Sequence, residues 1–205
     1  NFELTERVAS SLFKSGLFEK AGELYEHLGT TERALDSYKK GKCFRAAVDL
    51  CRTTNPAEVV KLEEQWGDYL ISQKQIDGAI NHFIEAGKSL KALDASMQAK
   101  QWKKAVSIVD TLEPSAKASE YLIKLADYFK TAGELDYAEK YYVEAGRTKE
   151  AIDMYFNQGK FDKAYTLAIS IQTKSQVYTW YTKHAKTLED KGDYKEAEKI
   201  YLIIG

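Results

Sequence analysis

The stretch from residue 133 to residue 164, GELDYAEKYYVEAGRTKEAIDMYFNQGKFDKA, decides the fold. Within it a glycine is followed five positions later by an alanine, and this motif occurs three times in close succession. Because glycine adopts the left-handed conformation that ends many helices, the spacing predicts short helices separated by tight turns. The three copies in this stretch are Gly133/Ala138, Gly146/Ala151 and Gly159/Ala164.

The same motif runs through the rest of the chain. Successive copies lie about 13 positions apart, except that every third step is about 33 positions, so the whole pattern returns with a period of about 59. Fixed self-similarity of this kind is typical of repeat proteins. The motif begins at Gly16, Gly29, Gly41, Lys74, Gly87, Lys100, Gly133, Gly146, Gly159 and Gly192.

The steps indicate the helix count. A step of about 13 residues holds one helix of about ten residues and a turn, whereas a step of about 33 residues holds two helices and a loop. In that longer step we expect Asn55 to cap a helix, Pro56 to open its first turn and Glu58 to complete the cap. The result is about four helices per 59-residue superrepeat. The β-branched residues never form the alternating runs that are typical of strands.

The superrepeats are predicted at residues 17–74, 75–133 and 134–192, with partial copies at 1–16 and 193–205. Pro56 and Pro114 then fall at nearly the same phase. We expect one solenoid segment over 1–205. The chain begins with Asn1 and ends on Gly205 where one further helix would stop, so we expect a segment of a longer protein.

One hairpin per superrepeat carries a tighter signature, in which small residues let two helices approach and large ones fill between them. Its spacing resembles the tetratricopeptide pattern, although the superrepeat is longer than the usual period of about 34 residues. The fold class we predict is therefore all-α, a right-handed α-solenoid of stacked antiparallel hairpins. In the third copy the signature residues are Leu122, Leu125, Ala126, Phe129, Ala138, Tyr142 and Ala145.

The composition of the chain argues against several classes of function. The 205 residues carry 30 basic and 31 acidic side chains, a net charge of -1 and a pI near 6.4. This balance argues against a nucleic-acid partner and against a membrane-surface protein. No apolar run approaches the roughly 18 residues of a transmembrane span, so direct membrane insertion is not expected.

No catalytic, cofactor-binding or metal-binding residue is predicted, and no cofactor is implied. Motifs such as HExxH, GxSxG and phosphate-binding loops are absent from the sequence. His27, His82 and His184 are interpreted as structural, and Cys43 and Cys51 as small apolar side chains. The lysines of 39–42 and 100–104 are assigned to turns, with an acidic-motif site as the alternative. Tyr121, Tyr178 and Trp180 either pack between helices or line a binding surface, so the binding residues stay unknown.

Short stretches of the sequence resemble a known family in their residues as well as in their spacing. The stretch 57–87, AEVVKLEEQWGDYLISQKQIDGAINHFIEAG, resembles the large WD40-plus-tetratricopeptide subunit family of intraflagellar transport complex B, as do KQWKKAV and RTKEAIDMYFNQGKFDKA. The resemblance implies a non-enzymatic scaffold segment in ciliary transport trains. It implies other intraflagellar transport subunits, and cargo or motor adaptors, as partners. The implied location is the cilium or flagellum and basal body, on the cytoplasmic side.

Other solenoids share this architecture. A vesicle-coat or complex A subunit would have the same helical hairpins. A tetratricopeptide adaptor that clamps a peptide carboxylate would need Lys and Asn on successive first helices; Lys61 and Lys124 are present without the accompanying Asn. A helical repeat that reads RNA would be more basic, with a constant period near 35.

Overall fold

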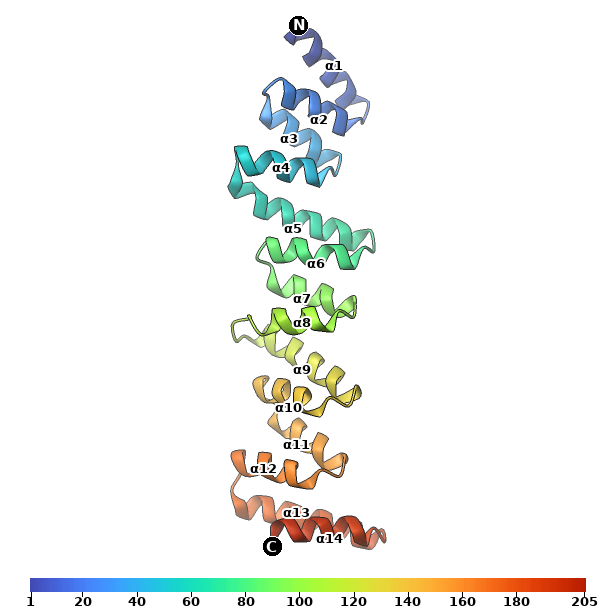
Figure 1. Cartoon of the computed structure of the whole chain (residues 1–205), viewed down its shortest axis with the longest axis vertical. Coiled ribbons are helices and arrows are strands. Elements are labelled where there is room, and N and C mark those ends of the chain that lie inside the picture. The colour runs from blue at the N-terminus through green and yellow to red at the C-terminus, as the bar shows by residue number, and fades with distance from the viewer. The chain divides into compact units, whose positions relative to one another are not determined.

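All regular secondary structure of the chain is helical. A computed structural model describes residues 1–205 as fourteen α-helices without strands, shown in chain order in Figure 1. This confirms the all-α solenoid prediction. Contacts divide the chain into two compact units, unit 1 (Asn1–Thr111) and unit 2 (Leu112–Gly205). The expectation of a single domain over 1–205 stays a prediction.

Unit 1 is a run of antiparallel helix pairs in which each helix packs against the next one in the chain. Because the turns are only a few residues long, sequential helices must lie side by side. The helices are α1 (Phe2–Lys14), α2 (Phe18–His27), α3 (Thr31–Lys40), α4 (Phe44–Thr54), α5 (Pro56–Ser72), α6 (Ile76–Glu85), α7 (Ser89–Gln98) and α8 (Trp102–Val109).

Unit 2 repeats this arrangement, and α12 also contacts α14. Its helices are α9 (Ala116–Thr131), α10 (Leu135–Glu144), α11 (Thr148–Asn157), α12 (Phe161–Ile171), α13 (Lys174–Asp190) and α14 (Tyr194–Ile204). Along the sequence, the sets α2–α5, α6–α9 and α10–α13 each contain three short helices and one long helix of 16 or 17 residues. The four-helix period is thereby confirmed.

The glycines end helices as expected. Gly133 has φ of +81°, its N–H donates to the Lys130 carbonyl, and the N–H of Glu134 donates to the Phe129 carbonyl at 2.9 Å. This pair of bonds satisfies carbonyls that the end of α9 leaves free. Lys74 and Lys100 take the same left-handed conformation, with φ of +60° and +58°. Lysine therefore replaces glycine at these two turns despite the cost of its Cβ.

One motif position is corrected. Gly41 has helical φ of -78°, and the left-handed residue is Lys42, with φ of +56°. The buried alanine five positions on is accordingly Ala47 rather than Ala46. Gly41 serves close packing instead, because a Cβ there would meet the Phe18 Cβ at 2.7 Å. With this correction the first three left-handed turns of the chain, at residues 16, 29 and 42, are evenly spaced.

The predicted cap of α5 is right in position and wrong in mechanism. Asn55 is the N-cap and Pro56 the first helical residue, but the Asn55 side chain makes no capping hydrogen bond. The Glu58 carboxylate accepts a hydrogen bond from Lys39 at 2.7 Å, so it is not available to close a capping box. A complete capping box occurs instead at α13, between Thr173 and Gln176.

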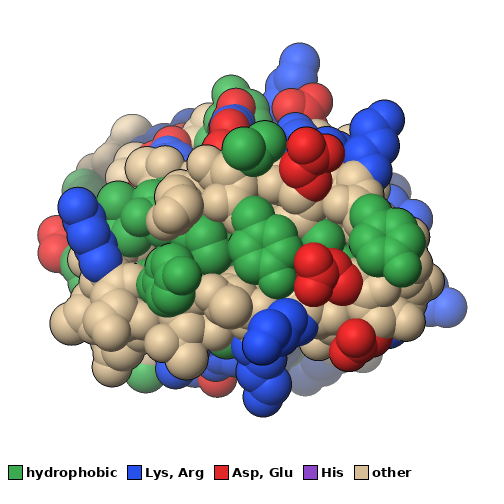
Figure 2. Space-filling model, turned by 90° about the horizontal axis from the view of Figure 1, so that it is seen from below, with side chains coloured by type: hydrophobic (Ala, Val, Ile, Leu, Met, Phe, Trp, Pro, Cys, Tyr) green, Lys and Arg blue, Asp and Glu red, His purple; other side chains and the backbone are tan.

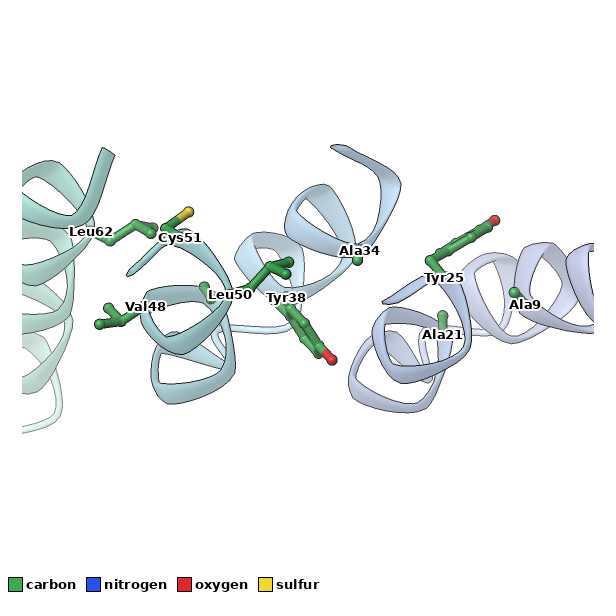
Figure 3. Close-up of a cluster of buried hydrophobic side chains, with 10 residues drawn as sticks. Ala9, Ala21, Tyr25, Ala34, Tyr38, Val48, Leu50, Cys51 and Leu62 are labelled. Carbon is green, nitrogen blue, oxygen red and sulfur yellow. The ribbon is translucent and has the colours of Figure 1, made fainter. Parts of the chain in front are cut away.

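Buried alanines mark the helix crossings. In unit 1 the alanines of α1 to α4 alternate with large side chains such as Tyr25 and Tyr38, which fill the space between helices (Figure 3). Where glycine takes such a place the fit is tighter still: a Cβ on Gly67 would meet the Phe83 ring at 2.6 Å. Fully buried alanines are Ala9, Ala21, Ala34, Ala47, Ala79, Ala92, Ala105, Ala126, Ala138, Ala151, Ala164 and Ala185.

Ala138 tests this packing. Replacing it by leucine should destabilise the chain by on the order of 1–3 kcal/mol, because the added methyl groups have no free volume between α9 and α10. Chemical denaturation monitored by circular dichroism measures the loss. Glu144→Leu, on the exposed side of the same helix, is the control and should change stability little. Equal stability of the Ala138→Leu variant and the parent would refute the assigned crossing.

Candidate interaction surface

The three histidines take part in packing or lie at the surface. His82 Nδ1 lies 2.7 Å from Oε2 of the buried Glu63, and its ring stacks on Trp66 at 3.9 Å between centroids. The pair joins α5 to α6. His184 Nδ1 donates to the Trp180 carbonyl at 3.0 Å, and His27 is exposed at the end of α2. No group of His, Cys, Asp or Glu side chains is arranged to hold a metal ion.

The cysteines are free thiols in apolar surroundings. Cys51 is fully buried and Cys43 half-buried. Desolvation by burial raises the pKa of both thiols, with the carboxylates of Glu19 and Glu23 adding to the shift at Cys43. A raised pKa disfavours the nucleophilic thiolate, which fits the interpretation of both residues as packing side chains.

The lysine clusters lie at helix ends. Lys39 pairs with Glu58 and Lys40 with Asp36 at 3.3 Å, while Lys42 and Lys100 occupy left-handed turns. The two ion pairs are intramolecular.

Of the aromatic candidates, Tyr121 and Trp180 are half-buried and Tyr178 is exposed. Trp180 packs edge to face on Phe156, with centroids 4.7 Å apart, and also contacts the His184 ring. Tyr121 is half-buried beneath Lys124. At the face formed by α13 and α14, apolar side chains gather between charged ones (Figure 2). The large exposed apolar residues of these two helices are Tyr178, Tyr194 and Leu202.

Ion pairs span alternate helices in unit 1. Arg33 of α3 binds Glu6 of α1, and Lys39 of α3 binds Glu58 of α5. The pairing is densest between α5 and α7. There Lys91 Nζ lies 2.8 Å from Glu64 and 2.9 Å from Asp68, and Lys88 lies 3.3 Å from Glu64. Lys91 also lies over the Phe83 ring, 5.4 Å from its centroid.

The α5–α7 ion pairs shift the acidities of their members. Hydrogen bonding to Lys91 holds the pKa of Glu64 below its ordinary value, and the same bond to Glu64 raises the pKa of Lys91. The charged forms of both groups are therefore stabilised in the folded chain.

Unit 2 has an open cleft at the corresponding place, between α9 and α11. Its volume is about 630 Å³. Tyr142 of α10 lies in its wall, where the buried phenol donates a hydrogen bond to Asp127; burial, followed by this bond, raises the pKa of Tyr142. Besides these two, the lining includes Ile123, Lys130, Arg147, Glu150, Asp153 and Met154.

A shift by one superrepeat explains the difference between the two places. It aligns Glu64 with Ile123 and Lys91 with Glu150, so the pair that bridges α5 and α7 is missing between α9 and α11. Arg147, which aligns with Lys88, binds Glu150 on its own side at 2.6 Å instead of crossing the cleft. This site was not predicted from the sequence, although the charges at equivalent positions of successive superrepeats contain the signal.

Comparison with known proteins gives the family. The family model for the TPR domain of intraflagellar transport proteins 140 and 172 matches residues 7–158, which is most of the chain. The chain belongs to this TPR domain family. This confirms the resemblance found in the sequence.

Relatives of this TPR domain align over nearly the whole chain. The intraflagellar transport protein 172 homolog of Danio rerio is 44% identical over 202 residues, and that of Homo sapiens is 43% identical over 204 residues. Intraflagellar transport protein 172 of Chlamydomonas reinhardtii is 43% identical over 202 residues. The alignments cover 98–100% of this chain but only 12% of each relative. None of the fourteen helices combines the length and apolar character needed to cross a membrane.

The α5–α7 ion pairs predict a pH-dependent contribution to stability. The folded-state pKa of Glu64 lies below its ordinary value of 4.5, so the stabilisation is complete above pH 4.5 and is lost as pH falls through the folded pKa. Lys91→Met should therefore cost about 0.5–1 kcal/mol at pH 7 and less as the solution is acidified. Urea unfolding at a series of pH values measures this difference.

Lys103→Met, at an exposed position of α8, is the matched control and should be nearly neutral at every pH. The loss of unfolding free energy caused by Lys91→Met could instead stay constant from pH 7 to below the folded-state pKa of Glu64. That result would show that lost packing, not the ion pair, explains the effect.

Proposed function

We propose that this chain is a non-enzymatic scaffold segment of an intraflagellar transport complex B subunit. The observation that carries the proposal is the alignment of 98–100% of the chain with intraflagellar transport protein 172 homologues at 43–44% identity. An alignment that runs through every predicted superrepeat is evidence for a common solenoid, with a common role as the simplest consequence.

The physical character of the fold supports a role in protein contacts. Stacked hairpins present a series of helix faces, each of which can meet a different partner. His82 and His184 pack against tryptophan rings, and both thiol pKa values are raised, so these groups support a structural role. The partners we propose are other intraflagellar transport subunits, with cargo or motor adaptors as further candidates.

The proposed location rests on the same family membership. We place the chain in transport trains of the cilium or flagellum and at the basal body, on the cytoplasmic side. Residues 1–205 would form one solenoid segment, contributing to cilium assembly and maintenance by holding neighbouring subunits together.

Affinity capture tests this proposal. The tagged chain is incubated with ciliated-cell extract at moderate salt, and co-purifying proteins are identified by mass spectrometry. An unrelated tetratricopeptide solenoid of similar length serves as the control for nonspecific capture. We expect intraflagellar transport subunits to be enriched on this chain relative to the control.

Other outcomes would reject the assignment. Enrichment of vesicle-coat proteins alone would favour a coat solenoid, and enrichment of chaperones alone would favour a peptide-binding adaptor. Enrichment restricted to complex A subunits would contradict the complex B assignment while preserving a role in transport.

A further inference from the structure

We propose that the α9–α11 cleft binds a Lys or Arg side chain from an extended segment of a partner protein. The inference deepens the scaffold function, on which it rests, by naming the chemistry of one partner. It is based on comparison of the open α9–α11 cleft with the equivalent place one superrepeat earlier, between α5 and α7. The Glu64–Lys91 ion pair bridges that place, which is called the closed place below.

The closed place shows where a cation fits. Between α5 and α7, the Lys91 ammonium donates to both oxygens of Asp68, at 2.9 and 3.0 Å, while it also pairs with Glu64. The ring of Phe83 lies beneath it. Carboxylates beside an aromatic face form a favourable environment for an ammonium or guanidinium group.

The open cleft retains acceptors and lacks the lysine that bridges α5 and α7. Asp127 aligns with Asp68 and Tyr142 with Phe83, whereas the lysine position is occupied by Glu150. Among the lining side chains, three carboxylates face two cations, which leaves a formal excess of one negative charge. Arg147 is engaged with Glu150. Lys130 pairs with Asp127 at 3.8 Å and lies over the Tyr142 ring, 5.9 Å from its centroid, so the excess charge remains after both lining cations are paired. An external cation would compensate the excess.

The apolar part of the lining selects a side chain over a free ion. Ile123 stands where unit 1 has Glu64, and the buried Met154 also contributes to the wall. Lysine and arginine place their methylene stems on apolar surface while the charged group contacts carboxylates. A volume of about 630 Å³ accommodates such a side chain with its adjoining backbone.

Peptide titration tests the proposal on the chain of residues 1–205. The probe is a short fluorescein-labelled peptide in which lysine alternates with alanine, and its binding is followed by fluorescence anisotropy at low salt. Matched peptides carry glutamine or glutamate in place of lysine. We expect saturable binding of the lysine peptide with one site, and binding weaker by about tenfold or more for the glutamine peptide.

Two variants locate the site. Glu150→Lys reverses a charge inside the cleft and should weaken binding of the lysine peptide by about tenfold or more. Glu144→Lys makes the same change in net charge on the exposed face of α10, outside the cleft lining, and should weaken binding less than about twofold. Circular dichroism and thermal melting confirm that both variants fold.

A third variant closes the cleft. Ile123→Glu combined with Glu150→Lys installs the pair that bridges α5 and α7, so the chain's own lysine should occupy the cleft and abolish peptide binding. Because this variant adds an ion pair, its melting temperature should equal or exceed that of the parent, which separates loss of binding from loss of folding.

Several results would overturn the proposal. Failure of the lysine peptide to bind, equal binding of the glutamate peptide, or equal weakening by Glu144→Lys and Glu150→Lys would each reject the cleft as the site. Self-association of the parent that Glu150→Lys removes would assign the cleft to a second copy of the chain. A chain that captures transport subunits but not the peptide would reject this site and leave the scaffold function standing.

Discussion

The close approach of successive helices is the constraint on which the rest of the structure depends. A side chain no larger than a methyl group lies at the crossings, and the alanines found there are fully excluded from solvent. With helix axes this close, large side chains such as Tyr38 and Phe83 must fill the space on either side of the contact, where they meet glycines on the opposing helix. Stability then comes from many similar interfaces rather than one large core.

Turn geometry follows from the same constraint. A short helix that must reverse and pack on its neighbour has room for only a short connection, and a left-handed residue closes it while satisfying the last carbonyls. Glycine supplies this conformation at least cost, yet lysine does so at residues 42, 74 and 100. The conformation is thus imposed by packing of the flanking helices, which outweighs the local preference of the side chain.

The features that depend on period could be predicted from the sequence. Alanine spacing, helix number and the positions of most turns all follow from the short step between motifs and the longer period of the superrepeat. Errors arose where two residues compete for one role: Gly41 and Lys42 are adjacent, and only the clash of a Cβ with Phe18 shows which one must be glycine. Similarly, Glu58 has the right position for a capping box, but Lys39 from another helix binds it. The α9–α11 cleft depends on which charged side chains face each other across alternate helices, and that requires the packed structure.

Because the superrepeats share one register, a substitution at one position can change what a single cleft binds. Because each position has an equivalent one superrepeat away, we expect replacement of one bridging pair to alter a defined cleft while the helices that form it keep their places. Glu64 and Lys91 close one such place, while Ile123 and Glu150 leave the next one open. In a scaffold built from similar hairpins, this provides a way to give individual repeats different partners.

The central claim is that the identity of the bridging pair decides whether a cleft is open. It is tested most directly by counting the lysine-peptide sites on a variant that lacks the pair between α5 and α7. Glu64→Ile combined with Lys91→Glu transfers the residues of the open cleft to the closed one, and isothermal titration calorimetry counts the sites. The account predicts two sites per chain in the variant against one in the parent, with the helical content unchanged. A single site in a fully folded variant would contradict it, because the identity of the bridging pair would then not decide whether the cleft is open.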